Sequence, residues 1–227
     1  MRRFVALYEA LDQTTRTNDK VAALVAYFKS APADDAAWAV ALLTGRKLVR
    51  AVSSALLRDL AAEATDLPTW LIEESYQAVG DLSETLALLL PDVAMTSDPT
   101  LSQVIEQHVL PLGIDDDQAK RRRIRQTWEQ FDREHRFLFH KMLSRSFRVG
   151  VSKKLVVRAL AEASGLDPAV IAHRLAGTWT PTASNYRQLI GEADEADQPG
   201  RPYPFYLASP LDDSSRTIGA DRLAAEL

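Results

Sequence analysis

The sequence predicts an all-α fold: a multi-helix bundle followed by a short non-helical C-terminal extension. Apolar residues recur at spacings of three and four along most of the first 190 residues, which is the period of a helix. The alternation of apolar and polar residues that is typical of strands does not occur before residue 200. A mean helix of about 11–12 residues then gives roughly ten to twelve helices.

Apolar stripes predict the first helices along the chain. They consist of Phe4, Leu7, Tyr8 and Leu11; of Val21, Leu24, Val25 and Phe28; and of Leu48, Val52, Leu56 and Leu60. Pro68 suits the first turn of the next helix, which passes through Trp70 and ends at Gly80. Asp81 and Glu84 have the spacing of a capping box, so a further helix begins at Asp81 and closes before Pro91.

The remaining helices are predicted by their start and stop residues. Asp98-Pro99 begins a helix, and the basic stretch 116–143 forms two helices with a break near Asp132. Gly150-Val151-Ser152 opens a helix that Gly165 ends. Asp167-Pro168 and Thr180-Pro181 begin the last two.

The composition changes after residue 190. Residues 1–190 are predicted to be one all-α domain, and 191–200, "GEADEADQPG", an acidic linker. Residues 201–227 contain a proline-rich aromatic stretch, "RPYPFYLASPL", and are expected to be the start of a truncated second domain.

The charge is distributed unevenly along the chain. The protein has a net charge of −4, but the segment from Lys120 to Arg158 holds thirteen Lys and Arg against three acids. That segment therefore carries about +10, and the rest of the chain about −14. Such asymmetry favours an anionic partner, with a solvated cationic helix face as the alternative.

The turn at Gly150 has the features of a phosphate site. Glycine lets the backbone approach an oxygen closely, and Ser152 can cap the helix or donate its hydroxyl. Lys153 and Lys154 fall in the first helical turn, where the helix dipole disfavours cations unless an anion is bound there. We expect Val151, Leu155, Ala159 and Leu160 to be buried, with Lys154 and Arg158 facing outward. The alternative is a basic surface helix with a glycine before it.

Two further turns resemble this one. Gly80-Asp81 offers backbone donors but acidic side chains, and alone would be read as a helix–helix corner. Arg46, Lys47 and Arg50 are predicted to open the helix that carries Val52 and Leu56, which again places cations at a helix start.

The sequence contains no candidate catalytic or metal site. Cysteine is absent, and no glycine pattern matches a nucleotide-binding loop or a nucleophile elbow. The four histidines lack metal-site spacing and are predicted to be packing residues, as are the four tryptophans. No apolar run approaches the length of a membrane span, so a cytoplasmic protein without a membrane partner is expected.

Several segments together resemble a known family. "REHRFLFHKML" followed by "FRVGVSKKLVVRALAEASGLDPAVIAHRLAG" resembles the N-terminal DNA-binding domain of bacterial ATP-dependent DNA ligases. "ESYQAVGDLSETLALLLP" resembles the earlier glycine turn of that family, and "RPYPFYLASPL" the segment that leads into the adenylation domain. The resemblance covers essentially the whole chain.

The resemblance implies a clamp on nicked duplex DNA, serving repair, recombination or replication in a bacterial cytoplasm. Together with the cationic pattern, it gives as predicted DNA-binding residues Arg46, Lys47, Arg50, Gly80, Asp81, Arg145, Ser146, Arg148, Gly150, Ser152, Lys153, Lys154 and Arg158. Relatives often have glycines where Arg145 and Ser146 stand here, so a less close approach to DNA is expected at that point.

The resemblance also implies what this chain lacks. The family takes AMP from ATP on the lysine of a Lys-x-Asp-Gly motif, with Mg²⁺ supporting the phosphoryl steps. No such motif occurs in the 227 residues, so we expect a monomeric ligase fragment that binds DNA without a catalytic residue or cofactor of its own. Two alternatives stay open: a helical-repeat scaffold for protein partners, and a helix-turn-helix regulator that reads one operator.

Overall fold

Helices are the only regular secondary structure in the part of the chain that the structure describes. This computed structural model describes residues 1–46, 48, 52–94, 98–144, 147, 149–176 and 179–191. Within those ranges it contains twelve α-helices, a π-helical turn and a 3₁₀ turn, which confirms the predicted all-α fold.

Most elements follow one another with short connections, but ten residues separate Leu43 from Ser54 and eleven separate Leu89 from Leu101. In chain order they are α1 (Arg2–Asp12), α2 (Thr17–Ser30), α3 (Ala33–Leu43), α4 (Ser54–Thr65), α5 (Thr69–Val79), α6 (Leu82–Leu89), α7 (Leu101–Gln103), the π turn η1 (Val104–Val109), the 3₁₀ turn η2 (Leu110–Gly113), α8 (Asp117–Gln130), α9 (Arg133–Ser144), α10 (Lys153–Ser164), α11 (Pro168–Arg174) and α12 (Ala183–Leu189). The break near Asp132 is confirmed, because α8 ends at Gln130 and α9 begins at Arg133.

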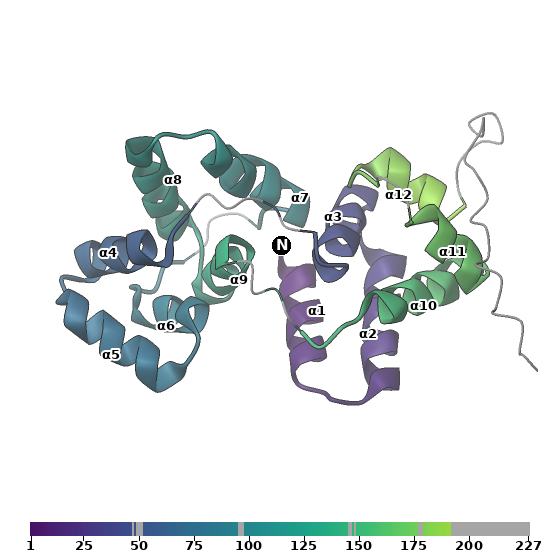
Figure 1. Ribbon diagram of the computed structural model, residues 1–227, viewed down its shortest axis with the longest axis horizontal. Helices are drawn as coiled ribbons and strands as arrows, with labels where there is room; N and C mark the ends of the chain where they lie inside the picture. Colours follow the sequence, from purple (N-terminus) through teal and green to yellow (C-terminus); the bar gives the residue numbers. More distant parts are fainter. Residues whose placement is uncertain are drawn as a thin grey trace, which may run out of the picture. The chain divides into compact units, whose positions relative to one another are not determined.

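The helices of residues 1–194 pack in two groups (Figure 1). In one group α2 packs against α1 and α10, α12 against α3, and α11 against α10. In the other, α6 packs against α9 and α5, and α4 against α5 and α8. Contacts of α1 with α9 and of α3 with α7 join the two groups. The start of α10 therefore belongs to the first group, and the corner between α5 and α6 to the second.

The apolar stripes form the core largely as predicted. Phe4, Leu7, Tyr8 and Leu11 are all buried, as are Val21, Leu24 and Phe28, whereas Val25 is half-buried. Trp38 and Trp128 are buried, but the prediction that every tryptophan packs in the core is wrong, since Trp70 on α5 is 66% exposed. Helix α5 buries Ile72 alone among its residues, so most of its surface remains in contact with solvent.

Helix α3 has no counterpart among the predicted helices. Every residue from Asp35 to Leu43 is buried. A helix that is surrounded on all sides shows no periodic apolar stripe, and most of these residues are alanine, valine or leucine. Asp35 is also buried, and its carboxylate accepts hydrogen bonds from the backbone N–H and the hydroxyl of Ser102 at 2.9 and 2.8 Å.

Three predicted helix starts are displaced. The helix expected at Thr180-Pro181 begins at Ala183, because Thr182 caps α12 by accepting a hydrogen bond from the Asn185 N–H at 3.2 Å. Leu48 and Val52 lie outside any helix, because Ser53 caps α4 by accepting a hydrogen bond from the Leu56 N–H at 3.1 Å. The helix expected at Asp98-Pro99 begins after Thr100, which forms a capping box with Gln103. In all three cases the residue that can accept a hydrogen bond from the third helical N–H sets the boundary.

The predicted domain division stays a prediction. Residues Met1–Asp194 form one structural unit. Apart from Gly191, the predicted linker 191–200 and the whole segment 201–227 lie outside the described residues.

Candidate nucleic-acid interface

The turn predicted at Gly150 is present before α10. Gly150 is exposed and has a φ of +60°, a left-handed backbone conformation that glycine adopts without the steric cost of a Cβ atom. Two residues later, Ser152 caps α10, and its hydroxyl accepts a hydrogen bond from the Leu155 N–H at 3.3 Å. Helix α10 then begins at Lys153, so an exposed glycine directly precedes the positive end of a helix dipole.

Three cations of α10 face solvent. Lys153, Lys154 and Arg158 are exposed, and none forms an ion pair with any residue that the structure describes. Lys153 Nζ donates to the Leu175 carbonyl at 3.3 Å, and Arg158 Nη2 donates to Asn18 Oδ1 at 3.3 Å. No carboxylate among the described residues therefore neutralises their positive charges.

The buried face of α10 is shifted from the predicted one. Val156, Val157, Ala159, Leu160 and Ala161 are buried, whereas Val151 and Leu155 are only half-buried. Helix α10 packs against α2, α11 and α3. The outward position predicted for Lys154 and Arg158 is confirmed.

The Gly80-Asp81 turn joins α5 to α6. Gly80 ends α5 with a φ of +81° and is exposed, and Asp81 caps α6 by accepting a hydrogen bond from the Glu84 N–H at 3.1 Å. The same carboxylate forms a salt bridge with Lys141 of α9. Asp81 therefore serves as a helix cap and as an anchor to α9, which is the structural role expected of a helix–helix corner.

These contacts set the charge of Asp81. Partial burial raises its pKa, but the hydrogen bond from Lys141 and those from the Glu84 and Ser83 N–H groups outweigh this effect. The pKa of Asp81 consequently lies below its ordinary value, and the side chain stays negative at neutral pH. A phosphate at this turn would have to bind backbone N–H groups at a distance from that carboxylate.

The prediction that Arg46 opens a helix is wrong. Gly45, with a φ of +89°, follows the end of α3, and the Arg46 N–H donates to the Ala41 carbonyl at 2.8 Å. Arg46 therefore lies beyond the C-terminus of α3, where a cation is favourable without any ligand. Its guanidinium donates to the Trp179 carbonyl at 2.8 Å. Lys47 and Arg50 lie outside the described residues, as do Arg145, Ser146 and Arg148.

Most cations of α8 are paired. Glu63 of α4 forms salt bridges with Arg121 at 3.1 Å and with Arg125. Arg123 pairs with Asp115 at 2.6 Å, and Lys120 with Asp117 at 3.7 Å. These acids lie outside the segment from Lys120 to Arg158. The charge counted within that segment is therefore partly neutralised by acids that the fold brings to α8.

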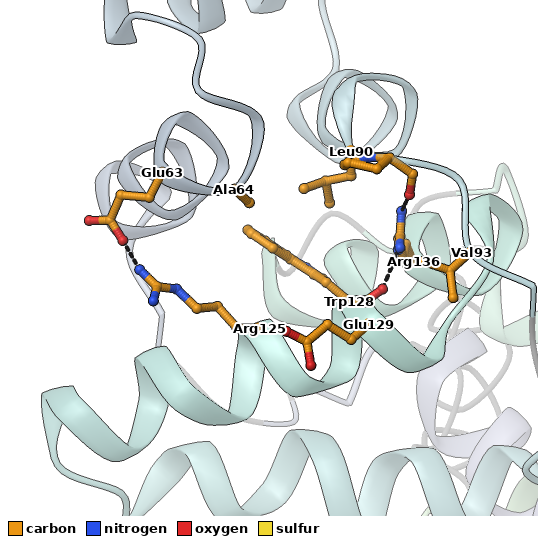
Figure 2. A pocket seen from close by; sticks show the side chains of 9 residues that line it. Glu63, Ala64, Leu90, Val93, Arg125, Trp128, Glu129 and Arg136 are labelled. Carbon is orange, nitrogen blue, oxygen red and sulfur yellow. Dashed lines mark hydrogen bonds and ion pairs between the residues drawn. The ribbon is translucent and has the colours of Figure 1, made fainter.

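A hollow of about 310 Å³ opens between α4 and α8 (Figure 2). Figure 2 shows the Trp128 indole lying across it toward Ala64, with Arg125 bound to Glu63 on one side. The buried Arg136 donates to the carbonyls of Pro91 and Trp128, and burial lowers its pKa. The guanidinium groups that line the hollow are thus committed to internal partners.

The histidines behave as packing residues where they are most buried. His135 is 0% exposed and His140 is 1% exposed. No group of three His, Asp or Glu side chains among the described residues is placed to hold a metal ion. Over the same residues, no helix is both long and apolar enough to cross a membrane.

Sequence reasoning missed one residue beside the Gly150 turn. Lys20 on α2 is 8% exposed, and its Nζ donates to the Val149 carbonyl at 2.7 Å and to the Gly150 carbonyl at 3.3 Å. The signal in the sequence was its position: Lys20 precedes Val21 and lies four residues before Leu24, on the side of α2 that carries the apolar stripe.

The comparison with protein families gives a match over most of the chain. The family described as DNA ligase N terminus matches residues 1–161, which include all of α1 to α9 and the beginning of α10. No curated protein matches the sequence.

Proposed function

Because the chain belongs to the DNA ligase N-terminal family, we propose that it binds duplex DNA through the phosphate backbone. Membership of this family supports the interpretation that the chain is the N-terminal domain of an ATP-dependent DNA ligase. In the proposed role, the domain holds nicked duplex for sealing, as in DNA repair in a bacterial cytoplasm. Gly150, Ser152, Lys153 and Lys154 provide its main phosphate contact.

The observation that carries the proposal is the set of unpaired cations at the start of α10. Lys153 and Lys154 lie in the first turn of a helix, where the dipole destabilises positive charge by typically 0.3–1 kcal/mol, and no carboxylate among the described residues compensates for it. A phosphate at this end would accept hydrogen bonds from free backbone N–H groups and attract both ammonium groups. The arrangement is unfavourable in isolation and favourable with an anion bound.

The proposed contact is independent of base sequence. Groups that bind phosphate fix the register of a protein on DNA but do not read bases. Arg158, one helical turn after Lys154, extends the cationic surface along α10. The Gly80-Asp81 corner is proposed as a second, weaker contact through its backbone, since its carboxylate is used by Lys141.

A salt titration with several duplexes tests the proposal. The full 227-residue chain is mixed with labelled duplexes of two unrelated sequences, each intact or singly nicked, and binding is followed by fluorescence anisotropy. We expect log Kobs to fall linearly with log salt, by about 0.9 for each phosphate neutralised, and equally for both sequences. Tighter binding to the nicked duplexes would support the clamp role.

Two results would contradict the proposal. Failure to bind any duplex at low salt would favour the helical scaffold for protein partners. Binding confined to one of the two sequences would favour a regulator that reads bases.

A further inference from the structure

Lys20 is a buried cation without an acidic partner in the described structure. Its two hydrogen-bond acceptors are the neutral backbone carbonyls of Val149 and Gly150, at 2.7 and 3.3 Å. Lysine is rarely this buried unless it is paired with an acid, because removing an ammonium from water is costly. The positive charge therefore lies directly behind the turn that precedes α10.

The two hydrogen bonds from Lys20 determine the orientation of the turn relative to α2. Lys20 holds the carbonyl oxygens of Val149 and Gly150 toward α2, and α2 packs extensively against α10. Gly150 itself is exposed. Because the ammonium binds the inner side of the turn, the outer side and the start of α10 remain open to solvent.

The hydrogen bonds of Lys20 to the turn require that residue 150 has no side chain. A Cβ atom placed on Gly150 would lie 2.7 Å from Lys20 Nζ, so any other residue would displace the ammonium. Gly165, at the other end of α10, has a similar φ of +74°, but apart from its chain neighbours no described residue has an atom within 4 Å of the position that a Cβ would occupy there. Gly150 is thus constrained by both backbone conformation and Lys20, whereas Gly165 is constrained by conformation alone.

We propose that Lys20 is a positioning residue for phosphate binding at the Gly150 turn. Its ammonium holds the Val149 and Gly150 carbonyls on the inner side of the turn. Its positive charge also attracts a phosphate bound on the outer side, and the low dielectric constant of the protein between them strengthens this attraction. The inference rests on the proposed function. Lys20 does not itself contact the phosphate; it acts through the backbone and through its charge.

Replacement of Lys20 tests the proposal. In the full chain, Lys20→Met keeps much of the side-chain length and removes the ammonium, and Lys29→Met removes the same charge from an exposed position of the same helix. We expect Lys20→Met to weaken binding to nicked duplex about tenfold and Lys29→Met to leave it within about twofold. Circular dichroism and thermal unfolding check that both variants are folded.

A chemical rescue separates charge from packing. The protein contains no cysteine, so Lys20→Cys introduces a single thiol. Alkylation of the unfolded variant with 2-bromoethylamine, followed by refolding, restores an ammonium at nearly the original length, while iodoacetamide adds a neutral amide. We expect the aminoethyl adduct to regain most of the lost DNA affinity and the amide adduct to regain little.

A glycine pair provides a second measurement that leaves Lys20 in place. Gly150→Ala should weaken DNA binding about as much as Lys20→Met, and the two changes together should weaken it by much less than the product of the single effects. Gly165→Ala should lower the thermal stability, because its left-handed φ disfavours alanine, but leave DNA binding unchanged.

The outcomes distinguish this inference from the proposed function. If Lys20→Met and the amide adduct bind DNA as well as the unmodified chain, while Lys154→Ala weakens binding, Lys20 has no positioning role and the phosphate site stands. If the unmodified chain shows no salt-dependent binding to duplex DNA, both proposals are overturned together.

Discussion

Helices α8 and α10 are both rich in cations, but most cations of α8 form ion pairs, with Arg122 as the exception, whereas those of α10 form none with any described residue. On α8, four cations form ion pairs with acids on α4, on the preceding loop or on α8 itself. On α10, Lys153, Lys154 and Arg158 have no ion pair with any described residue, and Lys20 adds a buried charge behind the turn.

The difference shows that a run of positive charge in a sequence does not by itself locate an anion site. The acids that neutralise α8, Glu63 and Asp115 among them, lie earlier in the chain and reach it only through the fold. A cationic surface attracts DNA where its charges lack internal partners. By that criterion the start of α10 is the stronger candidate, although α8 holds more cations.

The largest effect on DNA affinity is expected when unpaired cations are removed from α10. Lys153→Ala with Lys154→Ala should weaken binding to nicked duplex about a hundredfold at low salt, roughly tenfold for each ammonium group removed. The slope of log Kobs against log salt should become shallower by nearly 2, since each phosphate contact contributes about 0.9. Anisotropy titrations at several salt concentrations measure both quantities.

The matched control removes two paired cations. Arg121→Ala with Arg125→Ala deletes the same charge from α8, where Glu63 already neutralises it, and should change the affinity by no more than about threefold. An equal loss of affinity and of salt slope in the two double variants would show that net charge, and not unpaired charge at the Gly150 turn, governs binding.

Much of the fold could be predicted from the sequence, because local signals set most of its elements. The stripes of α1 and α2, the Asp81 cap, the turn at Gly150 and the Ser152 cap all follow from spacing and residue type. Helix α3 could not be predicted in this way, since a helix surrounded by protein has no polar face to reveal its period.

The candidate site was less predictable, because it depends on contacts between distant segments. Arg46 resembles a helix-start cation in sequence, but Gly45 ends α3 and Ser53 delays α4, so Arg46 lies beyond a helix C-terminus. Lys20 joins the site only because α2 packs against α10, across 130 residues of sequence. Charge pairing and burial of this kind are properties of the tertiary structure.

A second prediction concerns the pH dependence of stability, which tests the buried contact between α8 and α9. Trp128 of α8 donates to His140 Nε2 of α9 at 2.7 Å. Burial lowers the pKa of His140 to about 3 from an ordinary 6.5, Arg136 adds to the effect, and the Ser83 backbone opposes it. Because the folded pKa is depressed, the unfolded chain binds the extra proton first as pH falls.

Neutral His140 makes the folded protein more stable at neutral pH than at acidic pH. The stability contributed by neutral His140 is fully present above about pH 6.5 and is lost as pH falls from there toward 3, by up to about 1.4 kcal/mol per pH unit. His140→Gln keeps an acceptor for Trp128 and should flatten this dependence between about pH 6.5 and 5. Urea unfolding at several pH values measures it. Equal pH slopes in the two proteins would show that His140 is not the titrating group.

The smallest expected effect comes from releasing the charges of α8. Glu63→Gln removes the carboxylate that pairs with Arg121 and Arg125, which leaves two cations available to DNA. We expect about threefold tighter binding to intact duplex and a salt slope steeper by up to about 1, at a cost of less than about 1 kcal/mol of stability because these pairs are half-exposed. Glu74→Gln, an exposed change of the same charge on α5, is the control. If both substitutions raise the affinity equally, the change reflects net charge alone, and pairing by Glu63 is not what keeps α8 from binding DNA.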